Sequence, residues 1–419
     1  MKKIRIKNFK SFEDEDIYFE KLTVLTGGNG VGKSTVIQSL LILLQSFNKK
    51  DAGIIPNRYY LNDYYCELGS SEKLLYKDAN EDYIYFTFYD KNDNYSLFKF
   101  EKDKKDKNIF NLIDLIKDKD HLLENKSLNF LKYFEFIGAD RFGPRTFHHT
   151  DSNYFRINVG KYGEYTTLVL NMYKDEILDI DLPKNLKKAS LLTHVNYWLE
   201  RIFGFVQVDT DFIDEANIAI LKIKNDYNGD YHTPVNMPYG ISYVLPIIVS
   251  CLVRLIDKEK LFDNYKKEED SESEVIVIEN PEAHLHPSAQ SMIGIFLSYI
   301  AEKNIQIIVE THSDHVLNGI RKAIKSKIIN HKEVVVNFFE LKRSDEGVIR
   351  STSPKENIKI YDHEGTVIHE IPDMVISMEI NNNINHTIVN LIEINEQGEL
   401  EEWPQGFFDQ FEKDMMELL

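Results

Sequence analysis

The alternation of apolar and polar residues at the start of the chain predicts extended strands followed by a helix. Residues 3–9 alternate with period two, and residues 17–19 and 22–25 form a second extended stretch. A glycine-rich loop comes next, and beyond it apolar residues recur at helical spacing over a wide face. That face consists of Val36, Ile37, Leu40, Leu41, Leu43 and Leu44. The first 50 residues are therefore predicted to run strand, glycine loop, helix.

The next hundred residues have a different pattern. Residues 83–89 and 95–100 predict a β-hairpin that turns at residues 91–94. Residues 109–131 have helical spacing of apolar positions, and residues 136–145 predict a strand that ends in a polar loop. We therefore expect a lobe that is mainly strands, with one helix.

The second half of the chain alternates strands and helices. Helices are predicted at residues 191–203, 239–256 and 288–302, and short strands around residues 218–223. Two runs of branched apolar residues, 275–278 and 305–309, predict strands that are buried on both faces, as in a parallel sheet. The helix between them completes a strand–helix–strand unit. After about residue 331 we expect a strand-rich tail that ends in a helix at residues 407–418.

Composition narrows the class of protein. With 42% hydrophobic and 12% aromatic residues, the 419-residue chain can build a packed core, so disorder is not expected. The formal net charge of −18 argues against a surface that coats nucleic acid, although it leaves a local basic groove open. Cys66 and Cys251 form neither a disulfide framework nor a metal knuckle.

Apolar runs give no sign of export or membrane insertion. Residues 1–7 alternate charged and apolar side chains and lack the apolar stretch of a signal peptide. The longest apolar run, residues 244–256, is shorter than the roughly 18 residues of a membrane span and contains Pro246 and Arg254. We therefore expect a cytoplasmic protein with no membrane partner.

The glycine loop carries the most specific chemical signal. Its residues match GxxxxGKS without a gap, and they are Gly27, Gly28, Asn29, Gly30, Val31, Gly32, Lys33 and Ser34, followed by Thr35. Glycines allow backbone N–H groups to approach phosphate oxygens, and the helix that follows directs its positive end at the same anion. We expect Lys33 to bridge the β- and γ-phosphates and Ser34 to place its hydroxyl on Mg²⁺. The loop thus predicts binding of ATP with Mg²⁺; the alternative is a fortuitous glycine-rich turn.

Two polar segments follow the two buried strands. The segment ENPEAHLHP begins at Glu279, and a carboxylate at the carboxyl end of a parallel strand is where a Mg²⁺ ligand is expected. The alternative is a structural turn with a helix-capping acid. In the second segment, ETHSD, His312 is placed to contact the γ-phosphate or the attacking water, although most lone histidines are simply solvated or hydrogen-bonded.

A fourth segment, PYGIS, opens the helix predicted at residues 239–256. Its Gly240 and Ser242 are candidates to present N–H and hydroxyl groups to an anion. A plain helix N-cap is the commoner role of a serine at such a place, and both interpretations stay open.

Taken together and in this order, the four motifs resemble those of the ATP-binding-cassette-type heads of the SMC, RecF and overcoming-lysogenization-defect ATPases. The resemblance spans residues 1–50 and 235–320 and includes the opening segment IKNFKSF. The segment ADRFGP at residues 139–144 is similar to a subgroup of bacterial AAA-type ATPases whose C-terminal domain ends in WPxGFFD, here residues 403–409. Several relatives in that subgroup belong to anti-phage defence systems and act beside a separate effector.

The resemblance implies an α/β fold: an ABC-type P-loop ATPase head with a mixed sheet, a β-rich and helical insertion lobe, and a small α+β C-terminal domain. Residues 1–50 are then the N-terminal part of the head and 236–330 its C-terminal part. Between them, residues 51–150 form a β-rich lobe with a variable insertion, and 151–235 a helical and strand insertion. Residues 331–419 form the C-terminal domain.

The resemblance also implies a homodimer, or a higher homo-oligomer, that closes around ATP. Gly240 and Ser242 correspond to the signature segment that reaches the γ-phosphate bound by the opposite subunit. His312 corresponds to the switch histidine. Glu279 stands where the family has its Mg²⁺-ordering aspartate, so it is expected to share the metal with Ser34.

One position departs from the family. Asn280 stands where the catalytic glutamate is usual, and an asparagine side chain cannot accept a proton at neutral pH. Either Glu282, two residues further on, serves as the base, or hydrolysis is slow. Binding of ATP is therefore a firmer expectation than its rapid turnover.

The sequence also has three features that suggest other functions. A zinc site would use His284, His286 and His312. An intrinsic nuclease is disfavoured because residues 331–419 are short and contain no Asp-x-Asp pair after a strand. Basic clusters at residues 184–188 and 321–332 are either solvated helix faces or contacts to nucleic acid.

The tail has three aromatic residues whose role is open. Trp403, Phe407 and Phe408 are either a buried plug that holds the last helix or an exposed docking site, and the buried alternative is favoured.

Two classes of function remain. The first is a nucleotide-gated sensor or scaffold that hydrolyses ATP slowly and controls a separate effector protein in anti-phage defence. The second is a DNA-associated ATPase motor of the RecF or SMC type in DNA repair or maintenance. Asn280 favours the first, whereas the complete phosphate loop and His312 permit the second.

Overall fold

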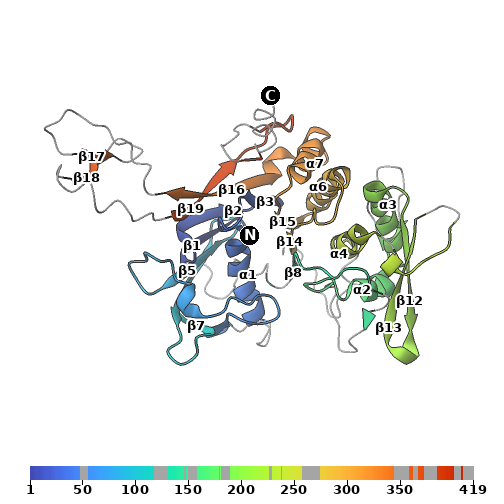
Figure 1. Ribbon diagram of the computed structural model, residues 1–419, viewed down its shortest axis with the longest axis horizontal. Helices are drawn as coiled ribbons and strands as arrows, with labels where there is room; N and C mark the ends of the chain where they lie inside the picture. Colours follow the sequence, from blue (N-terminus) through green and yellow to red (C-terminus); the bar gives the residue numbers. More distant parts are fainter. Residues whose placement is uncertain are drawn as a thin grey trace.

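A central sheet separates an antiparallel sheet on one side from a group of helices on the other (Figure 1). The computed structural model describes residues 1–47, 55–117, 131, 133–145, 148–149, 158–178, 180, 189–225, 229–236, 238–256, 274–343, 358–361, 367–371, 385–400 and 407–408. The expected α/β class with a mixed sheet is confirmed.

The central sheet collects strands from distant parts of the chain. Its order is β19 (Asn385–Ile392), β16 (Val334–Arg343), β3 (Leu22–Gly27), β15 (Ile305–Glu310), β14 (Glu274–Glu279) and β8 (Phe134–Ile137). β19 runs antiparallel to β16, and the other neighbours are parallel. β16 and β19 come from the region expected to form a C-terminal domain, yet they extend the same sheet as the strand before the phosphate loop.

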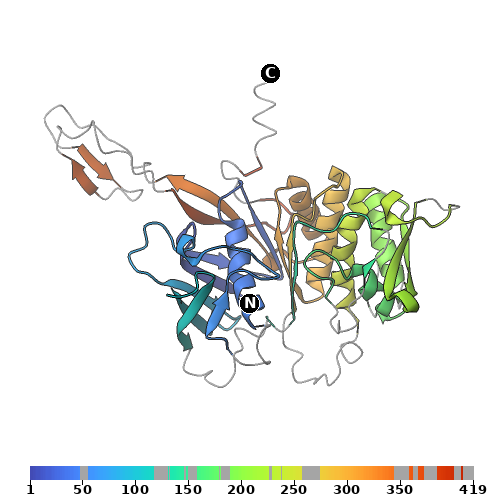
Figure 2. The ribbon, with the colours of Figure 1, turned by 60° about the horizontal axis from the view of Figure 1, so that its bottom comes forward.

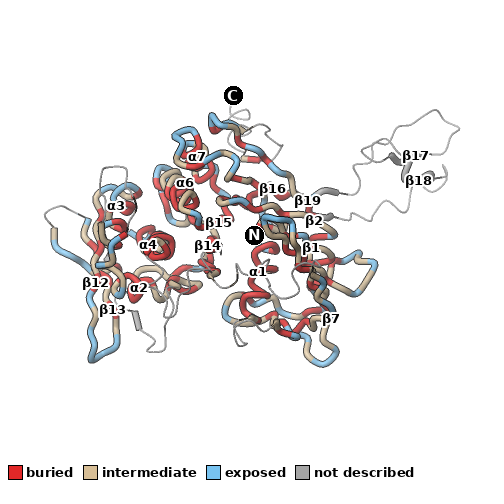
Figure 3. The backbone as a smooth tube through the Cα atoms, turned by 180° about the vertical axis from the view of Figure 1, so that it is seen from behind, coloured by how far each residue is buried: buried red, intermediate tan, exposed pale blue. Residues whose placement is uncertain are grey.

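Successive residues of the parallel strands face two different cores. Val24 lies in one core and Leu25 in the other, and Ile307 and Ile308 divide in the same way. One core includes α1 (Lys33–Phe47) and the antiparallel sheet. The other includes α2 (Thr166–Tyr173), α3 (Leu191–Phe203), α4 (Tyr239–Val253), α6 (Pro287–Glu302) and α7 (Asp314–Lys325). Because both faces are covered (Figure 3), apolar residues in these strands follow one another instead of alternating with exposed polar ones.

The antiparallel sheet confirms the predicted hairpin and corrects one predicted helix. Its order is β2 (Phe12–Tyr18), β1 (Lys3–Phe9), β5 (Ile84–Tyr89), β6 (Tyr95–Lys102), β7 (Ile109–Lys117) and β4 (Arg58–Tyr60). The helix expected from residue 109 is wrong over residues 109–117, which pair with β6 so that Leu115 lies opposite Phe98. The spacing of apolar residues over 109–117 fits both the helical and the strand period, so the hydrogen-bonded pairing with β6 determines that the segment is a strand. Residues 118–130 lie outside the described residues.

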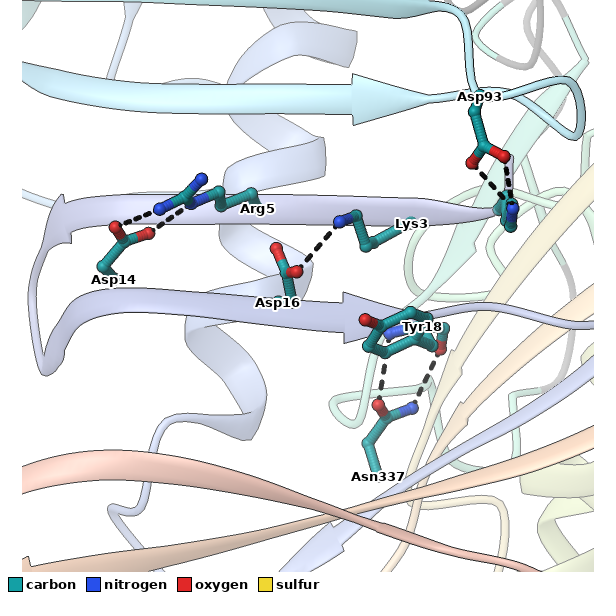
Figure 4. Close-up of polar contacts among 8 residues, drawn as sticks. Lys3, Arg5, Asp14, Asp16, Tyr18, Asp93 and Asn337 are labelled. Atoms are coloured by element: carbon teal, nitrogen blue, oxygen red, sulfur yellow. Dashed lines mark hydrogen bonds and ion pairs between the residues drawn. The ribbon is translucent and has the colours of Figure 1, made fainter.

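Polar contacts join β1 to β2, and the end of β2 to the central sheet (Figure 4). Arg5 donates two hydrogen bonds to Asp14, at 2.6 and 2.5 Å, in an exposed ion pair that contributes at most about 1 kcal/mol. At the end of β2, the backbone N–H and C=O of Tyr18 bond to the side chain of Asn337 at 3.3 and 3.0 Å. Asn337 is fully buried on β16, so its side chain joins the antiparallel sheet to the central sheet.

The remaining strands include a hairpin at the right of Figure 2, beside the helices, and a second hairpin at its upper left. They are β9 (His148–His149), β10 (Ile177–Leu178), β11 (Ala189–Ser190), β12 (Gln207–Ile213), β13 (Ile218–Lys224), β17 (Ile358–Tyr361) and β18 (Val367–Ile371). Short 3₁₀ helices occur at Ser71–Lys73, Asp214–Ala216, Pro234–Asn236 and His331–Glu333. The helices predicted at residues 191–203, 239–256 and 288–302 are confirmed as α3, α4 and α6.

The structure describes only part of the aromatic cluster that was predicted in the tail. Phe407 is buried and packs edge-on against Phe338, with ring centroids 5.2 Å apart, as the buried-plug interpretation expects. Trp403 and most of the helix expected at residues 407–418 lie outside the described residues. Within the described part of the chain, no helix combines the length and apolarity needed to cross a membrane.

Candidate nucleotide-binding site

The phosphate loop joins the end of β3 to the start of α1 in a backbone shape that requires glycine. Gly27, Gly30 and Gly32 have φ angles of +142°, +75° and +107°. A Cβ atom on Gly27 would lie 2.2 Å from the backbone oxygen of Phe339 on the neighbouring strand β16. Side chains at these positions would be strained or would clash, so the three glycines are needed for the loop itself.

Lys33 and Ser34, the first residues of α1, direct their side chains to the carboxyl ends of the parallel strands. The buried Lys33 ammonium donates hydrogen bonds to the carbonyl oxygens of Gly27 and Gly28, at 3.1 and 2.6 Å. Burial lowers the pKa of Lys33, and the negative charge of Glu310 opposes that shift. The Ser34 hydroxyl lies 3.2 and 3.3 Å from the two carboxylate oxygens of Glu310.

Two glutamates lie side by side at this edge of the sheet. Glu279 and Glu310 are the last residues of β14 and β15 and are partners in the strand register. Burial, and then repulsion from Glu310, raises the pKa of Glu279 to about 7. Burial also raises the pKa of Glu310, against the opposing effects of Lys33 and Ser34. Neighbouring carboxylates that are buried or half-buried are disfavoured as anions, and a nearby cation stabilises them.

The Ser34 hydroxyl and the Glu279 carboxylate have separate hydrogen-bond partners in the structure. The Ser34 hydroxyl bonds to Glu310, and Glu279 accepts a hydrogen bond from the Ala139 backbone N–H at 3.2 Å. The sharing of Mg²⁺ by Ser34 and Glu279 stays a prediction. Glu310 was not among the predicted site residues. Its signal in the sequence was its place at the end of the second buried strand, equivalent to that of Glu279.

Glu282 connects the two polar segments that follow β14 and β15. One of its carboxylate oxygens accepts a hydrogen bond from the Thr311 hydroxyl at 2.7 Å, and the other from the His312 backbone N–H at 2.9 Å. Burial and then the charge of Lys33 lower the pKa of His312, while Glu282 and a hydrogen bond with the Gly27 backbone oppose this. The structure therefore brings Glu282 and His312 to the phosphate loop.

Asn280 is fixed through its backbone. Its φ angle is +43°, and its N–H donates to the Glu310 carbonyl at 2.9 Å. The buried Arg141 guanidinium donates to the carbonyl oxygens of Glu279 and Asn280, each at 2.7 Å. The side-chain oxygen of Asn280 is buried and has no hydrogen-bond partner among the described residues. Arg141, in the ADRFGP segment, thus holds the strand end that carries Glu279 and Asn280.

Gly240 and Ser242 lie at the start of α4 and face a different set of neighbours. A Cβ atom on Gly240 would lie 2.8 Å from the backbone oxygen of His284, so this glycine allows α4 to pack on the ENPEAHLHP turn. Pro238 occupies the N-cap position, and Ser242 follows within the helix, so the N-cap interpretation of Ser242 is wrong. Ser242 is half-buried beside Phe142.

The three histidines of the zinc alternative have separate partners. The His284 ring lies 4.4 Å from the Tyr243 ring, and His286 bonds through Nδ1 to the Ser288 hydroxyl at 2.9 Å. His312 lies at the phosphate loop instead. Among the residues that the structure describes, no three His, Cys, Asp or Glu side chains are grouped so that they could hold a metal ion.

A fold with a glycine loop, a lysine and paired carboxylates at the ends of parallel strands defines a P-loop nucleotide-binding protein. The family model described as "AAA domain, putative AbiEii toxin, Type IV TA system" matches residues 22–318, and the chain belongs to this AAA ATPase family. A second model, described as a protein of unknown function (DUF3696), matches residues 375–418. No curated protein matches the chain.

Solved structures with a similar course of the chain include three SMC heads. The SMC head domain from Thermotoga maritima is 13% identical, with a TM-score of 0.38, over 81% of this chain and 95% of that one. An Smc head bound to the C-winged helix domain of ScpA is 13% identical, with a TM-score of 0.43, over 81% and 94% of the two chains. An Smc head with an extended coiled coil, bound to the C-terminal domain of ScpA derived from Pyrococcus furiosus, is 11% identical, with a TM-score of 0.43, over 81% and 93%.

Proposed function

We propose that the protein binds ATP with Mg²⁺ at the phosphate loop, dimerises around it, hydrolyses it slowly and thereby controls a separate effector protein. The observation that carries this proposal is the convergence of Lys33, Ser34, Glu279 and Glu310 at the carboxyl ends of β3, β14 and β15. Groups from the loop and from both neighbouring strands meet at one edge of the sheet, where α/β proteins bind their ligands.

The donor set fits a magnesium nucleotide. Magnesium prefers oxygen ligands, and a serine hydroxyl beside carboxylates supplies them. We assign Ser34 and Glu310 to the metal, with Glu279 beside them, and Lys33 to the β- and γ-phosphates. Bound Mg²⁺ would supply positive charge to the phosphate oxygens. The chain's own contribution is to hold Lys33 and Ser34 on a rigid helix start, with Gly28 to Thr35 around the phosphates.

The surroundings of Glu282 support slow hydrolysis. Asn280 cannot accept a proton, which leaves Glu282 as the candidate base. Both carboxylate oxygens of Glu282 already accept hydrogen bonds, from Thr311 and from the His312 backbone, so its capacity to take a proton from water is partly used. His312, on the same loop, is left to contact the γ-phosphate.

The position of Ser242 supports a site that is completed by a second subunit. The nearest neighbours of Gly240, two residues before Ser242, belong to His284, Leu285 and Phe203, and not to the phosphate loop of the same chain. We therefore assign Gly240 and Ser242 to the γ-phosphate held by the opposite subunit. The family's description names a putative toxin of a type IV toxin–antitoxin system, which supports a role beside a second component. A DNA-associated motor is the second candidate, favoured by the complete phosphate loop.

Calorimetry with ATP and Mg²⁺ tests the central claim. Lys33→Ala should abolish measurable ATP binding, whereas the same change at the exposed Lys332 should leave the affinity unaltered. Equal affinity of wild type and Lys33→Ala would refute nucleotide binding at this loop.

Light scattering tests the dimer: ATP should raise the molecular mass, and Ser242→Arg should prevent the rise while ATP still binds. A wild-type protein that stays monomeric with saturating ATP and Mg²⁺ refutes that part.

A further inference from the structure

A cavity of about 550 Å³ lies outside the nucleotide site, between α6, α7 and the turn at residues 397–399. Its lining includes Ser288 and Ser291 of α6, and Arg321, Lys322 and Lys325 of α7. α6 and α7 lie side by side (Figure 1); α6 and the first residues of α7 lie within the segment that matches the AAA family, whereas the turn lies within the segment that matches the second family. Ligand sites occur preferentially at such junctions.

The walls of this cavity are held in place by close backbone contacts. A Cβ atom on Gly319 of α7 would lie 2.0 Å from the backbone oxygen of Ser291, so α6 and α7 pack backbone against backbone. Gly398 has a φ angle of +75°, and a Cβ atom there would lie 2.4 Å from the backbone oxygen of Arg321. The Arg321 Nε also donates to the Gly398 carbonyl at 2.7 Å. The turn is therefore fixed on α7, and the cavity is part of the fold.

The cations that line the cavity have only neutral partners. Arg321 donates to the Gly398 carbonyl and, at 2.9 Å, to the side-chain oxygen of Asn318, and Lys322 lies 3.1 Å from the Ser291 hydroxyl. Within the described part of the chain, neither Arg321, Lys322 nor Lys325 forms an ion pair with a carboxylate. This is notable in a chain with 68 acidic and 50 basic residues. The lining also contains one carboxylate, that of Glu399, which accepts a hydrogen bond from the Asn395 side chain at 3.1 Å. Three cations without acidic partners on one helix outnumber this single carboxylate and favour an anionic ligand.

The other lining residues select among anionic ligands. Pro287 is the one apolar side chain of the lining, and the imidazole of His315 is its one aromatic ring, so the lining has no series of rings on which successive bases could stack. A nucleic acid strand would extend past the cavity onto the surface of a protein with a net charge of −18, which repels it. A short acidic peptide contacts only the cavity. Its repulsion by acidic surface residues more than about 8 Å away is screened at physiological salt.

The spacing of the cations fits an extended peptide. Side chains one helical turn apart, such as Lys322 and Lys325, are roughly 5–6 Å apart. Alternate residues of an extended chain lie on the same side at a spacing of roughly 6–7 Å. We propose that this cavity binds an extended acidic segment of a partner protein, whose alternate carboxylates pair with Arg321, Lys322 and Lys325. Ser288 and Ser291 donate hydrogen bonds to the same segment.

Fluorescence anisotropy with the full-length protein tests the proposal. The probe is a labelled peptide of sequence Gly-Glu-Ser-Glu-Ser-Glu-Gly, and the control peptide has glutamine at each glutamate. The acidic peptide should bind and the glutamine peptide should not. Lys322→Gln combined with Lys325→Gln should weaken binding roughly tenfold or more, because two of the three cations that pair with the peptide are removed. The matched control, Lys327→Gln with Lys332→Gln, removes two exposed cations outside the lining and should change affinity less than about twofold.

Competition and the Lys33→Ala variant complete the test. Equal binding of both peptides, or unchanged affinity of the Lys322/Lys325 variant, would overturn the proposal. So would displacement of the peptide by an equal concentration of single-stranded DNA or by inorganic phosphate alone, because these would define a nucleic-acid or small-anion site. Lys33→Ala should bind the peptide as the wild type does. The cavity's ligand is thus judged separately from nucleotide binding.

Discussion

The two ends of strand β14 both carry carboxylates, but in opposite electrostatic settings. At the amino end, Glu274 and its neighbour Glu135 each pair with Arg254 at 2.9 Å. At the carboxyl end, Glu279 and Glu310 lie next to each other, and neither forms an ion pair with any described residue. The same strand therefore carries one cluster that is neutralised within the fold and one that is not.

Arginine makes the difference between the two clusters. Arg254 reaches across from α4 to the carboxylates themselves, and the Ser250 hydroxyl adds a hydrogen bond to Glu135 at 2.6 Å. Arg141, at the other end, donates to backbone carbonyl oxygens of Glu279 and Asn280 instead. The first arrangement fixes the lobe that contains α4 to the sheet. The second holds the strand end still while leaving its carboxylates to an external cation.

The largest expected effect comes from breaking the neutralised cluster. Arg254→Met should lower the free energy of unfolding by about 3–5 kcal/mol, because it leaves two buried carboxylates unpaired. The same change at Arg201, exposed on α3, should cost less than about 0.5 kcal/mol. Denaturant titration measures both. If Arg254→Met does not fold, adding Glu135→Gln and Glu274→Gln should restore folding; a triple variant that stays unfolded would contradict this account.

The second prediction concerns the cluster that is not neutralised. Glu310→Gln should weaken Mg²⁺–ATP binding by about tenfold to a hundredfold, because a charged metal contact worth about 1.5–3 kcal/mol is lost. Its free energy of unfolding should stay the same or rise at neutral pH. The folded pKa of Glu310 is raised, so its ionised form opposes folding above the usual glutamate range. Loss of stability without loss of affinity would make Glu310 structural, like Glu274.

The third prediction tests the loop that follows β14. Asn280→Glu should increase steady-state ATP hydrolysis by about tenfold or more, since it places a proton acceptor after Glu279. Glu282→Gln should decrease it, while ATP affinity changes little. Phosphate-release assays at saturating ATP give both rates. If neither substitution alters turnover, the assignment of the base to this loop is wrong.

The smallest effect involves His194, a fully buried residue of α3 whose ring nitrogens have no partner among the described residues. Burial lowers the pKa of His194 to about 4, below its usual value of 6.5. The unfolded chain therefore binds the proton first as pH falls, and stability is lost between about pH 6.5 and pH 4. The loss between pH 7 and pH 5.5 should be about 1 kcal/mol.

His194→Leu provides the matched comparison. In this variant, the free energy of unfolding measured by denaturant titration should lack the loss attributed to His194 between about pH 7 and pH 5.5, since a leucine side chain cannot be protonated. A variant with the same pH dependence as the wild type would show that His194 is already protonated, or already paired, in the folded protein.

Local features of the sequence predicted the phosphate loop and most of the elements around it. The loop's glycines, the helix after it and the branched strands 275–278 and 305–309 depend on backbone sterics and on burial of both strand faces, which are visible over a few residues. Residues 109–117 were misassigned because their apolar spacing suits a helix as well as a strand. Pairing with β6 decides the matter, and pairing is a property of two segments.

The sequence by itself thus determined that Lys33 and Ser34 begin a helix behind a glycine loop, and that Glu279 ends a buried strand. Only the tertiary structure decided which carboxylate meets the Ser34 hydroxyl. That partner is Glu310, 276 residues away, because β15 lies between β3 and β14 in the sheet. The order of strands in a sheet depends on how distant segments pack together, so no local pattern carries it.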